Sequence, residues 1–458
     1  MTHTPEDSPV RNDRRSVARW SSWRAFLTSV ALLTRGALLG EVALLALLAS
    51  LGSATPLPAQ DTTRARRDSL AERLERAEEA IKLLQEQLAA QAQSGVQARS
   101  HAMLELSGRV LVTAFSNSRR VNNVDVPLFV RPDTASGLPQ GGAGMAIRQT
   151  TLGLAVTSFD MLGGKFRGDV DVDFFGGQMP SSGGRTFPLI RLRTARAIAS
   201  WKHAELLIGQ ESPLVSGVNP VSLASIGTPG FATAGNLWLW LPQVRVGLEG
   251  GGAVRLGVQG AVLAPTSGDA AGVFDTDNDA AERSRRPFVQ GRVHVSWGAD
   301  EMAGEIGIGV HRGWFATTGD SLLVSEAFTV DARIPLGRKL ELRGEGFSGQ
   351  ALRGLGGGGI GQGFGVIGIP VRSRGAWGQL NVTPSARVTI GAGYGFDDPR
   401  DADLPAGSRL KNVAMEAHLH LRPAGRFVFG FEYRRLETTY ASGMFANDHL
   451  NLAMGFEF

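Results

Sequence analysis

Hydrophobic and polar residues alternate along most of the chain from about residue 104, which is the period of a β-strand with one apolar and one polar face. In the last ten residues, the apolar side chains of Leu450, Leu452, Met454, Phe456 and Phe458 fall on one face. The other face carries Asn, Ala, Gly and Glu. Such a strand suits either a sheet whose outer side touches lipid or the final strand of a soluble sandwich.

The alternation recurs in about sixteen segments of roughly ten to fourteen residues each, the length and even number typical of an outer-membrane barrel. We expect these strands to begin near Leu104, Met145, Gly163, Phe187, His203, Leu239, Gly252, Arg286, Glu301, Ser321, Gly337, Pro370, Ser385, Arg409, Gly425 and Asn447.

The connections between the segments alternate in length. Tight joints such as 298–300 and 423–425 are separated by long polar or glycine-rich stretches. The long stretches cover residues 116–143, 176–187, 213–238, 265–286, 351–369, 397–408 and 439–447. Short turns on the periplasmic side and long loops outside are the arrangement of a barrel, whereas a sandwich has no reason to alternate. The pattern predicts an all-β fold, a transmembrane antiparallel β-barrel of about 16 strands over residues 96–458.

The amino-terminal region has the order of a secretory signal peptide. Residues 1–24 are polar and arginine-rich, residues 25–52 are largely Leu and Ala, and small residues and prolines follow up to residue 60. The uninterrupted apolar core, 42–51, is shorter than the ~20 residues that a spanning helix needs. We therefore predict a signal peptide over residues 1–60, with a retained helical anchor as the alternative.

Residues 61–95 change to a heptad pattern, with apolar residues at alternating spacings of four and three and Arg, Glu and Gln between them. The seam consists of Leu70, Leu74, Ala77, Ile81, Leu84 and Leu88. Because a helix this polar buries little by itself, the seam is expected to face other copies of the chain as a short periplasmic coiled coil. A solvated single helix is the alternative.

Composition narrows the function classes. The chain has 60 glycines and no cysteine, a formal charge of +4 and a mean hydropathy of −0.03. This average excludes a bundle of transmembrane helices, and the lack of cysteine removes thiolate catalysis and cysteine metal sites. The arginines are scattered singly along the strands, and a nucleic-acid surface would need them clustered.

The charged faces of the strands must line the barrel interior, because an Arg or Lys facing lipid at mid-depth costs about 2–4 kcal/mol. A barrel of around sixteen strands is wide enough for an aqueous channel. The candidate pore-lining residues are Arg109, Arg167, Asp169, Asp171, Asp173, Arg245, Arg255, Arg292, Arg333, Arg343, Arg426 and Arg434. Their excess of arginine favours anionic solutes, although each charge could equally hydrate the wall or pair across strands.

Three other features, an irregular stretch, an acidic loop and a histidine pair, each allow a structural or a functional interpretation. The irregular stretch 212–236 could narrow the lumen or lie on the outer surface. Residues 275–279 could offer oxygen ligands to Ca²⁺, but the EF-hand spacing is missing and a solvated loop is favoured. His418 and His420 share a face without a third ligand, and no nucleophile–base pattern occurs. We expect no metal, no cofactor and no enzymatic activity.

Several strings resemble the trimeric porins of the DcaP-like family and, more loosely, the phosphate-selective porins. They are Arg148-Gln149-Thr150-Thr151-Leu152-Gly153-Leu154, the run from Gly168 to Gly176, and Leu241-Pro242-Gln243-Val244-Arg245. A signal peptide, a short coiled coil, a sixteen-strand barrel and a terminal Phe add to the likeness. The resemblance implies a homotrimer in the outer membrane that takes up small anionic solutes passively. Having only three tyrosines departs from the usual tyrosine-rich girdles.

The sequence thus predicts an outer-membrane porin, in contact with lipid, for passive diffusion of small hydrophilic solutes. Phe458 is expected, by resemblance to outer-membrane proteins, to belong to the signal read by the barrel insertion machinery. The alternative is a structural barrel with a plugged lumen, tethered to the cell wall by its coiled coil.

Overall fold

The computed structural model describes residues 103–134, 138, 140–177, 187–268, 277–317, 321–364 and 368–458. The predicted signal peptide and the six seam residues of the predicted coiled coil lie outside these ranges. No helix within them is long and apolar enough to cross a membrane.

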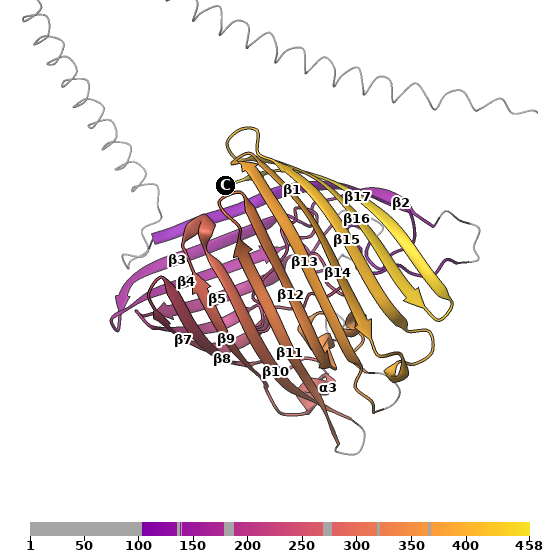
Figure 1. Cartoon of the computed structure of the whole chain (residues 1–458), viewed down its shortest axis with the longest axis horizontal. Helices are drawn as coiled ribbons and strands as arrows, with labels where there is room; N and C mark the ends of the chain where they lie inside the picture. Colours follow the sequence, from indigo (N-terminus) through magenta and orange to yellow (C-terminus); the bar gives the residue numbers. More distant parts are fainter. Residues whose placement is uncertain are drawn as a thin grey trace, which may run out of the picture. The chain divides into compact units, whose positions relative to one another are not determined.

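One antiparallel sheet contains all the described strands (Figure 1). The strands are β1 (Met103–Asn117), β2 (Gly142–Ala146), β3 (Thr151–Met161), β4 (Gly164–Asp173), β5 (Arg191–Ser200), β6 (Ala204–Glu211), β7 (Leu241–Gly251), β8 (Val254–Leu263), β9 (Phe288–Trp297), β10 (Gly304–Ala316), β11 (Leu322–Pro335), β12 (Leu340–Gln350), β13 (Arg372–Ser385), β14 (Val388–Pro399), β15 (Arg409–Leu421), β16 (Phe427–Tyr440) and β17 (Gly443–Glu457). The short helices are α3 (Ala280–Arg283), η2 (Asp300–Met302), η3 (Leu352–Leu355), η4 (Gly359–Gly361) and η5 (Asp401–Asp403).

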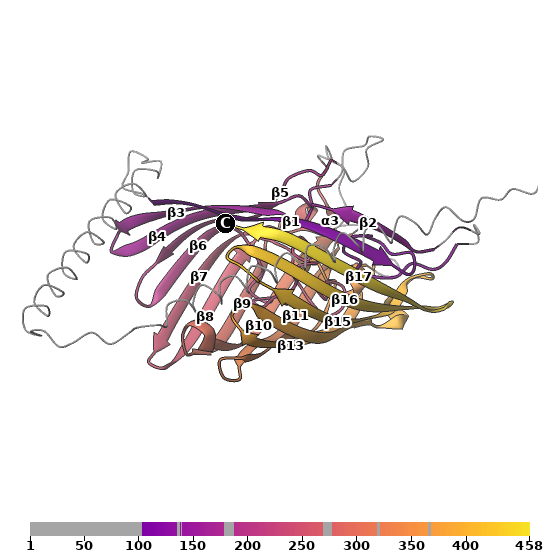
Figure 2. The same ribbon diagram turned by 90° about the horizontal axis from the view of Figure 1, so that it is seen from above.

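The sheet closes on itself because β1 pairs with β17 as well as with β2 and β3. The two short strands β2 and β3 follow one another along the same edge of β1, so they form one interrupted strand. The closed barrel therefore has sixteen strand positions, as the sequence predicts. Figure 2 shows β1 lying beside β17 on one side and β3 on the other.

The break between β2 and β3 is compensated locally. The backbone N–H of Leu111 on β1 has lost its partner in the ladder and donates to Oγ1 of Thr150 at 3.1 Å. Arg148, in the break, forms a buried ion pair with Asp125, with Nε–Oδ2 and Nη2–Oδ1 distances of 2.8 and 2.6 Å. A buried charge pair is tolerated when both groups are hydrogen-bonded in this way. The string that resembles a porin motif thus interrupts a strand and turns polar side chains inward.

The two faces of the barrel differ as the alternation predicts. On β17 the side chains of Leu452 and Met454 are 56% and 57% exposed on the outer face, whereas Asn451 is 1% exposed inside. The same contrast recurs around the wall, where Ile308, Val330 and Phe431 are exposed outside. Only lipid makes such an apolar outer surface stable, and only a polar interior makes the inward charges stable.

One expected loop is absent. We expected residues 439–447 to form a long loop, but β16 continues to Tyr440 and β17 begins at Gly443, with these two residues opposite each other. Thr438, Thr439, Met444 and Phe445 extend the alternation to the turn, which leaves only two residues to connect the strands. The last strand therefore starts four residues earlier than expected.

The seam between β1 and β17 is formed by the carboxyl terminus itself. Gly108 N–H donates to the Phe458 carbonyl and Phe458 N–H donates to the Gly108 carbonyl, both at 3.0 Å. A Cβ on Gly108 would lie 2.7 Å from the Thr151 carbonyl oxygen and 2.8 Å from Cζ of Phe458. The closing contact therefore requires glycine at this position.

We predict that Gly108→Val disturbs closure of the barrel. The added side chain must displace the neighbouring strand or the Phe458 ring, an overpacking cost of about 1–3 kcal/mol. The folded fraction can be measured from the mobility difference between boiled and unboiled protein in electrophoresis. Gly260→Val is the control, because a Cβ there meets nothing within 4 Å. An equal folded fraction for both variants would contradict the prediction.

Candidate channel and its constriction

Residues 212–240, here called the inner loop, connect β6 to β7 and fold into the barrel lumen. Its apolar side chains at Leu214, Val215, Leu223, Phe231 and Leu237 are buried against the inner wall. The sequence left two placements open for this stretch, inside the lumen or on the outer surface. The structure selects the first, and the inner loop narrows the lumen.

Glu432, on the inner face of β16, is the strongest single anchor of the inner loop. Its carboxylate accepts hydrogen bonds from Oγ of Ser222 at 2.6 Å, from the backbone N–H of Leu223, and from the backbone N–H of Ala224 at 3.1 Å. His420 Nε2 lies 2.9 Å from the same carboxylate. Hydrogen bonds to an ionised group are about twice as strong as neutral ones. One wall carboxylate thus fixes a whole turn of the loop.

Glu345, on β12, holds the loop at two points further along. Ser216 Oγ donates to it at 2.9 Å and Leu237 N–H donates at 3.3 Å. These contacts lie 21 residues apart in the loop, so the single carboxylate ties its beginning to its end. The loop supplies hydrogen-bond donors to this buried side chain, and the side chain in turn fixes the loop.

Wall glutamines satisfy the backbone groups that remain. Gln379 on β13 accepts from Val221 N–H at 2.7 Å and donates to the Val221 carbonyl at 3.0 Å. Gln149, in the break between β2 and β3, accepts from the N–H groups of Ile226 and Gly227 at 2.8 and 2.9 Å. A loop removed from water needs such partners for its N–H and C=O groups.

Apolar and close backbone contacts also hold the inner loop against the wall. Phe231 stacks on Trp377 of β13 with a ring-centroid distance of 5.5 Å. Gly235 adopts φ +110° and lies so close to β13 that a Cβ would fall 2.3 Å from the backbone of Ala376. The backbone N–H groups of Trp238 and Leu239 donate to the carbonyl of Leu355 in the segment 351–364, which also enters the lumen. The inner loop therefore covers the wall from β9 to β16.

A cavity of about 630 Å³ remains on the opposite side, between the inner loop and the wall of β1, β3, β4 and β5. Loop residues Asn219, Pro220, Ser222 and Ser225 form one side. The charged side chains on the other are Arg109, Asp171, Arg193, Arg422 and Glu457. The open part of the lumen is therefore bordered by charged wall residues and by a polar edge of the inner loop.

A ladder of alternating charges runs up the wall beside this cavity. Three arginines of β5 face three aspartates of β4. The pairs are Arg196–Asp169 at 2.7 Å, Arg193–Asp171 at 2.8 Å and Arg191–Asp173 at 2.6 Å. The sequence analysis identified the aspartates but not their partners. The alternation of Arg191, Leu192 and Arg193 at the start of β5 could have identified two of these partners, Arg191 and Arg193, as inward-facing residues.

The inward orientation of Arg196 could not be predicted from the alternation, because the register between β4 and β5 shifts. The pairing of β4 with β5 slips between Asp171 and Val172, so that Thr194 and Leu192 are their partners. After this irregularity the inward parity changes from odd to even positions on β5. A strict period of two therefore assigns Arg196 to the wrong face.

The predicted pore-lining residues fall into several groups. Arg109 and Asp171 border the cavity. Arg343 and Arg434 lie beneath the inner loop, where they donate to the Asn219 carbonyl and to Ser225 respectively. The remaining positions on inward strand faces are Arg167, Asp169, Asp173, Arg245, Arg255, Arg292 and Arg333. Arg426 precedes β16 in an exposed turn and belongs to no strand.

Most inward arginines are neutralised by close carboxylates. Arg292 pairs with Asp331 and Glu305, Arg434 pairs with Glu416, and Arg255 pairs with Glu249. Arg333 and Arg343 share Glu341, and Arg109 pairs with Glu457. Among the predicted pore-lining arginines on inward strand faces, Arg245 differs. Its guanidinium donates to the Ser212 carbonyl at 2.6 Å and to Gln243 at 3.0 Å, and it has no carboxylate of the described residues within ion-pair distance.

The two weaker candidates have structural explanations. His418 and His420 stack with a centroid distance of 4.4 Å, and His420 serves the Glu432 anchor. Asp279 caps α3, accepting from the N–H groups of Ala281 and Glu282 at 2.8 and 2.9 Å. No group of three or more potential metal ligands occurs in the described ranges. Residues 275 and 276 of the loop that was considered as a Ca²⁺ site, and for which a solvated loop was favoured, lie outside them.

Comparison with known proteins gives a fold but no sequence family. No protein-family model and no curated protein matches the chain. The solved structure of the outer membrane channel DcaP of Acinetobacter baumannii superposes with a TM-score of 0.60 at 17% identity, covering 80% of this chain and 99% of that one. An anion-selective porin from Comamonas acidovorans superposes with a TM-score of 0.51 at 13% identity, covering 78% and 100%. The resemblance to DcaP-like porins expected from the sequence is thus confirmed at the level of the fold.

Proposed function

We propose that the protein is an outer-membrane porin through which small hydrophilic solutes diffuse passively. The observation that carries this proposal is the cavity left between the inner loop and the charged wall of β1, β3, β4 and β5. A closed barrel with an apolar outside and a polar, incompletely filled inside is the architecture of a diffusion channel. The inner loop sets the size limit and the charge ladder sets the electrostatic field.

Anion preference is the finer part of the proposal. The charged side chains around the cavity are three arginines and two carboxylates, a formal excess of one positive charge. Further support comes from Arg245, the inward arginine described above without a carboxylate partner. The likeness to a porin titled anion-selective agrees with this direction.

We further propose that the barrel assembles as a homotrimer in the outer membrane, with the heptad segment 61–95 on the periplasmic side. The outer face of β5 offers the small side chains Ala195, Ala197 and Ala199, which suit close contact between barrels. Phe458 at the seam is the residue proposed to belong to the insertion signal.

The second candidate is a structural barrel whose lumen is plugged. It is favoured by the extent of the material inside: besides the inner loop, Val126 and Val130 of the segment 118–141 and Ile360 of η4 are fully buried. A plugged barrel would hold its shape but conduct nothing. Conductance therefore separates the two candidates.

We expect the purified chain to produce stepwise current increases when it is added to a planar lipid bilayer in KCl. Each step reports insertion of one channel unit. A protein that inserts, as judged by its protection from protease in the same lipid, yet gives no steps would support the plugged barrel and overturn the porin proposal.

We predict that Glu432→Gln loosens the inner loop. The neutral amide weakens several charge-assisted hydrogen bonds, each worth about 1.5–3 kcal/mol. Single-channel recordings should show higher conductance or more frequent transitions between current levels. Glu437→Gln is the matched control, since Glu437 lies on the same strand and pairs with Arg435 instead of the loop. Identical recordings for both variants would contradict the anchoring role.

We predict that Arg245→Gln shifts selectivity toward cations. A unit charge about 10 Å from an ion in water contributes about 0.4 kcal/mol with opposite signs for an anion and a cation, which corresponds to roughly a fourfold change in the permeability ratio. The reversal potential in a KCl gradient measures this ratio. Arg435→Gln removes the same charge outside the lumen and should leave it unchanged. A cation-selective parent channel would refute the anion preference.

A further inference from the structure

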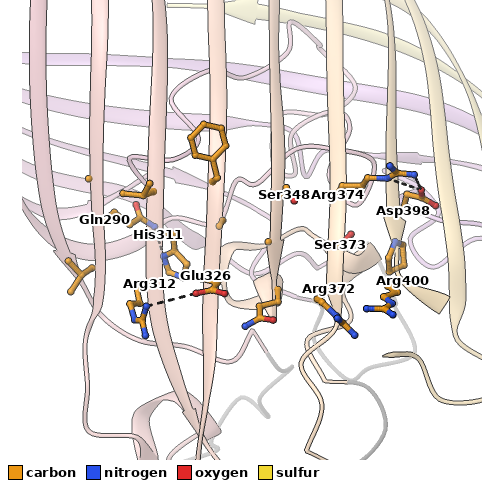
Figure 3. A pocket seen from close by; sticks show the side chains of 18 residues that line it. Gln290, His311, Arg312, Glu326, Ser348, Arg372, Ser373, Arg374, Asp398 and Arg400 are labelled. Carbon is orange, nitrogen blue, oxygen red and sulfur yellow. Dashed lines mark hydrogen bonds and ion pairs between the residues drawn. The ribbon is translucent and has the colours of Figure 1, made fainter. Parts of the chain in front are cut away.

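A hollow of about 1090 Å³ lies on the outer face of the barrel, across β9 to β14. It sits at the end of these strands that adjoins the long connections 264–287, 351–371 and 400–408. In the proposed orientation this end faces the outside of the cell, so the hollow lies at the level of the outer leaflet. Figure 3 shows the polar side chains that project from neighbouring strands into it.

Four arginines line the hollow in two adjacent rows. The row nearest the long connections contains Arg312, Arg372 and Arg400, and the next row contains Arg374 (Figure 3). The register explains this order: Arg312 is opposite Glu326, which is opposite Gln350, which is opposite Arg372. The backbone N–H of Arg400 then donates to the Arg372 carbonyl at 2.8 Å. The strand pairing thus concentrates positive charge on one side of the hollow.

These guanidinium groups are oriented by acids yet remain open to the outside. Arg372 donates to both oxygens of Asp403 at 2.7 and 2.5 Å, while its side chain stays 48% exposed. That hydrogen bond lowers the pKa of Asp403, which keeps the carboxylate charged. Arg374 donates to Asp398 at 2.9 Å and is 73% exposed. A guanidinium has five N–H donors, so both retain donors for a ligand.

The local charge is positive. Four arginines and two carboxylates, Glu326 and Asp398, line the hollow, and Asp403 behind Arg372 leaves a formal excess of one positive charge. Arg400 makes no ion pair or side-chain hydrogen bond within the described part of the chain. An anionic group with several acceptor oxygens matches this arrangement.

The outer surface below the arginines is formed by small residues on two strands. Ser348 of β12 lies opposite Arg374 of β13, and Gly346 lies opposite Ala376. Gly378 is the next outward position on β13. The fold does not require glycine here: a Cβ on Gly346 would lie at an ordinary 3.6 Å from Ala376 Cβ. Phe328 on β11, 51% exposed, stands beside this strip. The strip offers a shallow apolar track that leads from the arginines toward the middle of the membrane.

A second copy of the chain is a poorer occupant of this surface. The fully buried centre of a protein interface is depleted in charged residues, whereas the hollow is lined by six of them. A phosphate-bearing headgroup matches the arginine geometry, because guanidinium binds phosphate through paired N–H donors. An acyl chain matches the apolar track below. The two features together describe an anionic amphiphile.

We propose that the outer hollow binds a phosphorylated glycolipid of the outer leaflet. Its phosphate lies against Arg372, Arg374 and Arg400, and one acyl chain follows the strip of Gly346 and Ala376. The proposal rests on the proposed function only in placing the barrel in an outer membrane. It assigns to the outer wall a binding role that is separate from passage through the lumen.

The test compares two probes on the full chain in detergent micelles. Native mass spectrometry measures binding of diphosphoryl lipid A and of the same lipid with its phosphates removed. We expect the phosphorylated form to bind more tightly, and Arg372→Gln/Arg400→Gln to weaken it about tenfold or more, because a charge-assisted hydrogen bond is lost at each position. Arg400→Gln alone, which breaks no ion pair, should give a smaller loss in the same direction. Gly346→Leu should weaken both lipids by filling the strip.

The control is Arg435→Gln, on the outer face of β16, which should bind lipid A like the parent. Equal affinity for the two lipids, or unchanged binding by the double variant, would overturn the proposal. Loss of the oligomer without a change in lipid binding would overturn it in favour of a contact between copies. Bilayer conductance of the same variants keeps the tests separate: channels that conduct normally but bind no lipid A contradict only this inference.

Discussion

Closure of the sheet is the constraint on which the rest of the structure depends. An open strand edge in hydrocarbon would leave a row of N–H and C=O groups without partners, at several kcal/mol for each group. The pairing of β1 with β17 removes both edges, and the reciprocal hydrogen bonds of Gly108 and Phe458 complete it at the carboxyl terminus. Once the wall is closed, side chains have only two destinations, lipid or lumen, and the alternation of the sequence follows from that choice.

The interior obeys the same requirement by different means. The inner loop has no sheet partner, so its backbone groups need acceptors and donors from the wall. Glu432, Glu345, Gln379 and Gln149 supply them from β16, β12, β13 and the break before β3. Each is an inward residue that would face water in an empty barrel. The constriction is therefore built from wall side chains that hold a loop in place.

The sequence predicted the wall well because a strand in a membrane barrel is decided locally. Each segment between Leu104 and Phe458 carries its own apolar face, and most expected strands begin within four residues of their observed positions. The loop predicted over residues 439–447 is wrong, because the polar residues there belong to the ends of β16 and β17, which are joined by a turn at 441–442. The pairing of β1 with β17 follows from the same requirement, since an edge strand in lipid needs another edge as its partner.

The candidate site was predicted less completely, because its geometry depends on residues far apart in the chain. Nothing local in the stretch 212–236 says that Ser222 meets Glu432, 210 residues away. The inward orientation of Arg196 depends on a one-residue irregularity between β4 and β5, which composition and period do not reveal. The arginine count suggested a strongly positive lumen, but most arginines proved to be paired with acids on adjacent strands.

The inner loop is attached mainly to one part of the barrel wall, so substitutions in different parts of the wall have different consequences. Residues on β12, β13 and β16 are tied to the loop, so changes there alter the shape of the passage and the stability of the barrel together. Asp169 and Asp171 of β4 and Arg193 and Arg196 of β5 lie on the other side and pair with one another, whereas Arg191 of β5 donates to the Gly227 carbonyl of the loop. Descendants of this chain could therefore exchange charges on β4 and β5 to accept new solutes while the loop stays in place. A protein engineer could use the same separation to retune a pore without rebuilding it.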